Sequence, residues 1–169
     1  MANTYTLIQS VTVGSSGTAS IEFGSIPQTY TDLVLKISGR TNYGSLSDDT
    51  VIEFNGVSTN ISSRWLQGSG TAASSSNSST IAPIFEQGST STAGVFSNTE
   101  IYIPNYTGSA NKSFSIDNVT ETNATTIYTR LLAGLWSNTS AITSITYRSF
   151  YASTIQQHSS ASLYGIKNS

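Results

Sequence analysis

The amino-acid sequence predicts an all-β protein, a sandwich or barrel of about ten short strands. Apolar residues alternate with polar residues at a period of two through most of the chain, whereas helical spacing is hard to find. The 169 residues include 32 Ser and 24 Thr. Threonine has high strand propensity, and either hydroxyl can face solvent between two inward apolar residues. The composition therefore fits a folded β-protein with a hydroxyl-rich surface.

The first part of the chain is expected to form three strands. Thr4 to Val13 and Thr18 to Phe23 alternate apolar and polar residues, and the turn residues 14–17 lie between them. We therefore expect these two strands to pair as a hairpin with a four-residue loop. Asp32 to Arg40 is predicted to be the third strand, with Leu33, Leu35 and Ile37 on one face.

The next segment is predicted to hold a polar loop and two further strands. The loop covers Thr41 to Asp49. Thr50 to Phe54 is a short strand that ends at Asn55-Gly56, the dipeptide most favoured in tight β-turns. Ile61 to Leu66 is the candidate partner of that strand.

A long loop and an edge strand are expected after these strands. Gly68 to Ser79 contains almost only Gly, Ala, Ser, Thr and Asn, which is typical of a mobile loop. Thr80 to Phe85 is interrupted by Pro83, which cannot donate to a strand ladder, so this segment is predicted to be an edge strand or an extended segment.

The second half of the chain is predicted to contain five strands. The longest apolar run in it favours a strand over a helix, because β-branched residues begin it and Gly134 lies inside it. The five ranges are Val95 to Pro104, Lys112 to Val119, Thr125 to Trp136, Ala141 to Tyr151 and Ser160 to Ile166.

Length and composition restrict the possible functions. We expect one domain over residues 1–169. With no Cys and only His158, disulfides, thiol catalysis and multi-histidine metal sites are excluded. A net charge of −2 argues against nucleic-acid binding. No stretch approaches the roughly 18 apolar residues of a membrane span, and no secretory signal begins the chain. No cofactor is expected.

The acidic residues do not form a recognisable catalytic or metal-binding pattern. Asp48, Asp49 and Glu53 lack calcium-loop spacing, so they are interpreted as solvated loop charges. The other acids are scattered singly, several at positions expected to point outward, and no pair can be placed at a glycosidase separation. His158 is interpreted as a polar loop residue. The protein is therefore expected not to be an enzyme.

Three residues are the candidate interface or glycan contacts: Tyr43, Arg64 and Trp65. Trp, Tyr and Arg are enriched at interface hot spots. Exposed aromatic rings on a β-sandwich can also stack on sugars. Trp65 fits a core position and an interface position equally well, whereas Trp136, at the end of the longest apolar run, is expected to be a core residue.

The order of several segments resembles a family of small virion structural proteins of tailed bacteriophages, common among cyanophages and other marine phages. These segments are Tyr5-Thr6-Leu7-Ile8, Ile21-Glu22-Phe23, the run from Ile26 to Leu35, Phe54-Asn55-Gly56 with Asn60-Ile61-Ser62, Ile103-Pro104-Asn105-Tyr106, the run from Ala141 to Thr146 and Ala161-Ser162-Leu163-Tyr164-Gly165-Ile166. The chain departs from the family at Ala152 to Ser160, which contains Gln156-Gln157-His158 where a Gly-rich stretch is usual.

The resemblance implies a jelly-roll-like antiparallel β-sandwich, often assembled as a trimer, without catalytic residues. Such domains serve as capsid decoration (cement) proteins, head fibres or knobs, or terminal domains of tail fibres. We therefore expect a non-enzymatic virion protein that is made in the host cytoplasm and contacts itself, as a homotrimer, and the major capsid protein. The alternative is a tail-fibre-type module that binds host-surface glycans. A polysaccharide depolymerase is disfavoured because no carboxylate pair is recognisable.

Overall fold

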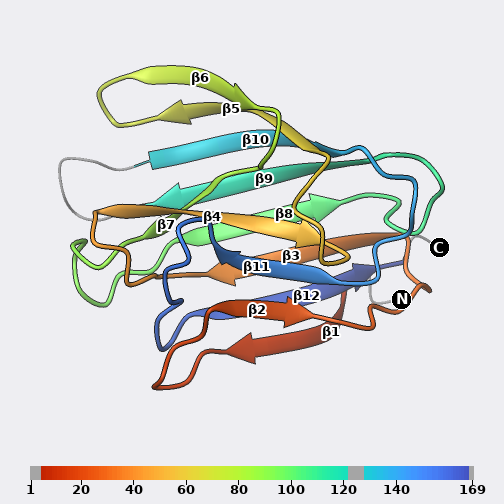
Figure 1. Cartoon of the computed structure of the whole chain (residues 1–169), viewed down its shortest axis with the longest axis horizontal. Coiled ribbons are helices and arrows are strands. Elements are labelled where there is room, and N and C mark those ends of the chain that lie inside the picture. The colour runs from red at the N-terminus through yellow and green to blue at the C-terminus, as the bar shows by residue number, and fades with distance from the viewer. Residues whose placement is uncertain (1–4, 122–127, 168–169) are drawn as a thin grey trace.

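The fold is an all-β sandwich. The computed structural model describes residues 5–121 and 128–167, and these residues form twelve strands and no helix. They form two antiparallel sheets of eight and four strands (Figure 1). The strands are β1 (Tyr5–Thr12), β2 (Ser20–Phe23), β3 (Asp32–Ser38), β4 (Ser47–Phe54), β5 (Ile61–Gly68), β6 (Ala73–Ser78), β7 (Ile84–Gln87), β8 (Asn98–Ile103), β9 (Lys112–Thr120), β10 (Tyr128–Trp136), β11 (Ile145–Ser149) and β12 (Ser160–Ile166).

Eight of the strands have the topology of a jelly roll, as the resemblance implies. The larger sheet contains the order β1-β12-β3-β8, and the smaller sheet is β2-β11-β4-β7. The hydrogen-bonded pairs are therefore nested along the chain: β1 with β12, β2 with β11, β3 with β8 and β4 with β7. This nesting is what results when one long antiparallel ribbon is rolled into two packed sheets.

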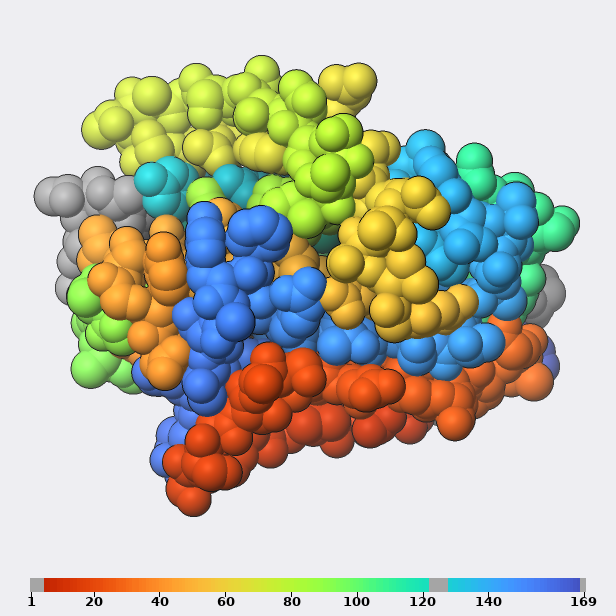
Figure 2. Space-filling view, viewed as in Figure 1, coloured from red at the N-terminus to blue at the C-terminus, as the bar shows by residue number. Residues whose placement is uncertain are grey.

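Four additional strands extend the larger sheet beyond β8, in the order β9-β10-β5-β6. They come from two insertions into the jelly roll, one between β4 and β7 and one between β8 and β11. Figure 2 shows the yellow-green β5–β6 hairpin as the upper rim of the molecule. The extension thus adds a broad sheet face that the eight-stranded jelly roll lacks.

The core lies between the two sheets and follows the alternation seen in the sequence. Every second residue of β9 and of β10 is buried or half-buried. Phe54 of β4 packs against Phe114 of β9 and Trp136 of β10, with ring centroids 5.4 Å apart in both pairs. Trp136 is fully buried, which confirms the expectation that it is a core residue.

Two predicted strand pairings are wrong. The strands at Thr4 to Val13 and Thr18 to Phe23 do not form a hairpin, because β1 belongs to the larger sheet and β2 to the smaller one. Their true partners are β12 and β11, more than a hundred residues along the chain. Likewise β5 pairs with β10 and β6, while β4 pairs with β11 and β7. In both cases the connection crosses between the sheets.

Two predicted loops are partly strands. Within Gly68 to Ser79, residues Ala73–Ser78 form β6 and pair with β5 over six registered positions. The backbone of β5 hydrogen-bonds to the backbone of β6. Polar residues can therefore form this edge strand without an apolar pattern of their own. The predicted loop Thr41 to Asp49 already enters β4 at Ser47.

The proline-interrupted segment is confirmed as an edge. β7 begins one residue after Pro83 and is one of the two edge strands of the smaller sheet. The remaining predicted strands are present with shifted ends. Thr4 and residues 125–127 of the predicted strands lie outside the described residues. Among residues 5–121 and 128–167 there is no helix that could span a membrane.

Candidate functional site

The outer face of the sheet extension carries an exposed apolar patch. We call Leu66, Val119, Leu131 and Leu135 the outer leucine patch. They occupy alternate, outward positions of β5, β9 and β10, the inward positions of which are buried or half-buried. Leu66 is 64% exposed and Leu131 is 59% exposed, and the two are direct cross-strand neighbours. Exposed apolar side chains that gather on one sheet face mark interaction surfaces.

Small side chains make the patch concave. Ser75 lies opposite Leu66 on β6, and Ala133 of β10 lies opposite Ser115 of β9. These small side chains border the two leucines and leave a groove of about 580 Å³. A second groove of about 450 Å³ continues from Leu66 and Leu131 toward the end of β5. A third, of about 440 Å³, runs along the same strands to Leu135. The outer face of the sheet extension therefore contains three adjoining grooves, bordered by the exposed leucines.

Opposite charges flank this groove. Arg64 lies opposite Ala133 on β5, and Asp117 lies opposite Leu131 on β9, so both point outward from strands on either side of β10. Within residues 5–121 and 128–167, the ion pairs are Lys36 with Glu100 at 3.0 Å and Arg148 with Glu53 at 2.6 Å. Arg64 and Asp117 are thus available to charges on another molecule.

Trp65 is on the other face of the same strand. It packs against the core from the inside, beside the Arg130 guanidinium, whose carbon lies 5.0 Å from the Trp65 ring centroid. The same guanidinium lies 3.5 Å from the ring centroid of Phe85 and donates hydrogen bonds to the Pro83 carbonyl and the Gln67 side chain. Burial lowers the pKa of Arg130 to about 10. Trp65 is therefore part of an inner cluster.

The three predicted contact residues do not form one site. Arg64 and Trp65 are consecutive strand residues and point to opposite sides of the sheet. Tyr43 lies in the β3–β4 connection and stacks on Tyr151 with ring centroids 4.9 Å apart. Phe150 meets Tyr151 edge-on, and both of these rings are exposed. The sequence did not identify Phe150 and Tyr151 as candidate contact residues, because the alternation of β11 stops before them.

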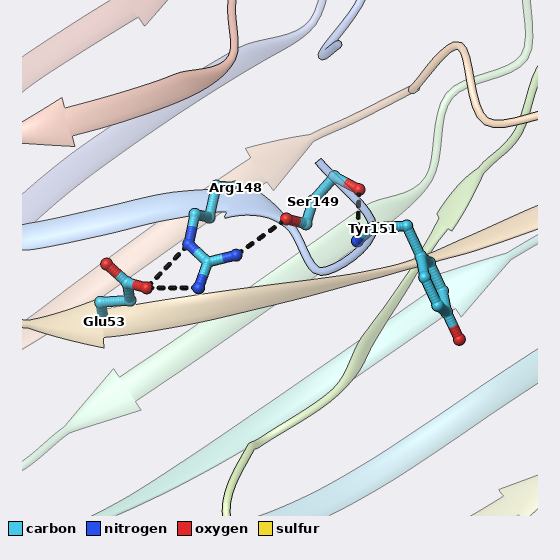
Figure 3. A network of polar contacts seen from close by, with 4 residues as sticks. All are labelled: Glu53, Arg148, Ser149 and Tyr151. Atoms are coloured by element: carbon cyan, nitrogen blue, oxygen red, sulfur yellow. Dashed lines mark hydrogen bonds and ion pairs between the residues drawn. The ribbon is translucent and has the colours of Figure 1, made fainter. Parts of the chain in front are cut away.

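A polar network supports the strand end that carries Tyr151 (Figure 3). Arg148 pairs with Glu53 across β11 and β4, and it also donates to the Ser149 carbonyl at 3.0 Å. The Ser149 hydroxyl accepts the Tyr151 backbone N–H at 3.1 Å. Figure 3 shows the Tyr151 ring pointing away from this network, so the turn is held in place while the ring stays accessible.

The expectation that Asp48 is a solvated loop charge is wrong, because Asp48 is a buried residue of β4. It lies opposite Glu86 of β7, which is also buried. Burial raises the pKa of Glu86 to about 8; a contact with the Tyr147 hydroxyl opposes this rise and the charge of Asp48 adds to it. Burial also raises the pKa of Asp48. Both groups point into the core, away from solvent.

Metal binding and relatives give no further assignment. The described part of the chain contains no group of three or more His, Asp or Glu residues placed to hold a metal ion. His158 is an exposed loop residue, as expected. Comparison of the chain with protein-family models, with curated proteins and with solved structures finds no match.

Proposed function

We propose that the protein is a non-enzymatic structural component of a tailed-phage virion, a capsid decoration or head-fibre protein that acts by subunit packing. The observation that carries this proposal is the outer leucine patch. Leu66 and Leu131 project from a regular sheet face that no other part of the described chain covers. The jelly-roll topology and the sequence resemblance to small virion proteins support the same role.

The physical basis of the proposed role is burial of this face against a neighbour. Complete burial of a leucine side chain contributes roughly 1.5–3 kcal/mol. Ser75, Ser115 and Ala133 leave room beside the leucines for side chains of a partner. Few charges need to be desolvated, since only Arg64 and Asp117 flank the groove. A contact of modest affinity gives strong overall binding when several linked copies bind a repeating shell at the same time.

The proposed partners are other copies of the chain, as a homotrimer, and the major capsid protein. The proposed location is the virion. Cosedimentation with purified heads that lack the chain tests this role. We expect saturable binding that is lost in the double variant Leu66→Ser, Leu131→Ser. Leu46→Ser is the matched control, because Leu46 is also exposed but lies in the β3–β4 connection. If the double leucine variant and Leu46→Ser bind heads equally well, the outer leucine patch does not mediate binding.

A second candidate function is a tail-fibre-type module that binds host-surface carbohydrate. The observation that favours it is the stacked pair Tyr43 and Tyr151 with exposed Phe150 beside it. Exposed rings at the loop end of a β-sandwich offer flat apolar faces to a sugar ring. Binding to purified tails instead of heads would favour this candidate over decoration.

A further inference from the structure

Four connections of the jelly roll meet at one end of the molecule. They are residues 13–19, 39–46, 88–97 and 150–159, which follow β1, β3, β7 and β11. Because the nested strand pairs are antiparallel, these connections must lie at the same end. They lie together at the left end in Figure 1, and Figure 2 shows red, orange, green and blue segments gathered there.

A groove of about 500 Å³ lies among these connections. Apart from Arg40 and Phe96, its larger side chains are neutral hydrogen-bonding groups: amides, hydroxyls and one imidazole. No carboxylate lines it. The main contributors are Ser16, Asn42, Thr154, Gln156, Gln157 and His158. Amides and hydroxyls both donate and accept hydrogen bonds, which matches the two-way hydrogen bonding of sugar hydroxyl groups.

The guanidinium of Arg40, the one permanently charged group in the groove lining, already makes its hydrogen bonds within the protein. Arg40 is 6% exposed, and its guanidinium donates to the carbonyls of Ser91, Thr92 and Val95 at 2.8–3.0 Å and to the Ser91 hydroxyl. It thereby fixes the long β7–β8 connection in place. A ligand therefore meets a preorganised wall and not a free positive charge, which favours a neutral molecule over an anion.

The other walls are also held in a defined conformation. The Asn42 side-chain oxygen accepts the Thr154 backbone N–H at 2.8 Å and so ties two of the connections together. His158, in the groove lining, has a φ of 72°, a left-handed conformation that non-glycine residues rarely adopt. Such backbone conformations cluster at binding sites.

Aromatic rings accompany the polar groups. Phe96 is half-buried and lines the groove itself. Tyr43 follows the groove residue Asn42 in the chain and stacks on Tyr151. An aromatic face next to hydrogen-bonding amides is the combination that recognises a pyranose, since the ring has an apolar face and a polar rim.

We infer that this end of the jelly roll is a binding site for a neutral saccharide, with the sugar hydroxyls in the groove and an apolar sugar face against an aromatic ring. The site is independent of the packing role proposed above and gives the second candidate function a defined location. A free oligosaccharide and a host-surface polymer share this chemistry.

Ligand-detected NMR with a panel of neutral and acidic oligosaccharides tests the inference. Two variants remove hydrogen-bonding groups at exposed positions: Gln157→Ala, and His158→Gly, which keeps a residue suited to the positive φ. The double variant Leu66→Ser, Leu131→Ser is the control on the outer leucine patch. Thermal unfolding verifies that all variants remain folded.

We expect saturable binding of a neutral oligosaccharide, about tenfold weaker in each groove variant, which corresponds to the loss of one hydrogen bond of about 1.4 kcal/mol. The leucine variant should bind as the parent does. Absence of saturable binding to any neutral sugar, preference for acidic sugars, or undiminished binding in the double variant Gln157→Ala, His158→Gly would each overturn the inference. None of these results alters the head-binding assay, so failure of this site and failure of the packing role are distinguishable.

Discussion

Leu66 of β5 and Leu131 of β10 lie directly opposite each other on the outer face of the larger sheet, and both side chains are more than half exposed. Their strand neighbours Trp65 and Leu132 also lie opposite each other but point toward the core. Two adjacent cross-strand pairs of the same strands thus have opposite environments. The outward pair is the centre of the proposed packing surface, and the inward pair stabilises the fold.

The two pairs should respond differently to substitution. Leu131→Ser is expected to change the free energy of unfolding by less than about 0.5 kcal/mol, because its side chain is exposed. Leu132→Ala removes a buried side chain and is expected to cost about 2–5 kcal/mol. Urea unfolding monitored by circular dichroism measures both. Similar destabilisation by the two substitutions would show that the outer face is covered within the molecule.

Arg130→Met should destabilise the sheet extension. The substitution removes the hydrogen bonds to the Pro83 carbonyl and Gln67 and the stacking of the guanidinium on Phe85. Loss of such a buried charged network costs about 3 kcal/mol. The Trp65 indole N–H resonance should shift as well. Arg64→Met is the matched control, since Arg64 is exposed, and it should leave stability and the indole resonance unchanged.

Stability should fall as the pH rises from about 4.5 to about 8 because of Glu86. Its pKa is 4.5 as a free group and about 8 in the folded protein, so between these values the folded state holds a proton that the unfolded state has released. Folding is then progressively less favourable as pH increases, and the effect is complete above pH 8. Burial also raises the pKa of Asp48, which acts in the same direction.

The variant Glu86→Gln tests this assignment. Because Gln does not ionise, the variant should be more stable than the parent at pH 9, by at least about 1 kcal/mol, and its stability should vary less with pH. Denaturant midpoints between pH 4 and pH 9 measure the effect. An unchanged pH profile in the variant would contradict a buried, titrating Glu86.

Gly134→Ala should disrupt the packing between β10 and β9. A methyl group at this position would collide with the ring of Phe114, its direct cross-strand neighbour. The ring packs against Phe54 at the centre of the core, so it has little room to move. Overpacking of this kind costs about 1–3 kcal/mol. The double variant with Phe114→Leu should recover part of the loss, whereas additive losses would place the strain elsewhere.

The alternation of apolar residues was sufficient to predict the class of fold and most strands. In β9 it predicted Phe114 and Ile116 on one face, and both are buried. It did not predict which strands pair, because in a jelly roll the partners of β1 and β2 are the last two strands of the chain. Local sequence contains no signal for such distant pairing. β6 was missed because its Ser-rich residues resemble a linker, while its pairing depends on β5.

The candidate sites depended even more on tertiary structure. Arg64 is at the groove on the outer sheet face, but only the structure separates it from Trp65, which faces inward. Leu66 and Leu131 look like core residues in the sequence, and they are exposed because no other element of residues 5–121 and 128–167 covers this face of the sheet extension. The buried pair Asp48 and Glu86 was unexpected, because a carboxylate in the sequence carries no sign of the direction in which it points.

The proposed virion role is tested most directly by mass-spectrometric quantification of the chain in separated heads and tails of its proposed source, a tailed phage. We expect many copies of the chain per purified head, in the same number from one preparation to the next. In particles assembled with the variant Leu66→Ser, Leu131→Ser, this copy number should fall sharply while the control Leu46→Ser retains it. Absence of the chain from purified particles, or undiminished incorporation of the leucine variant, would contradict the proposal.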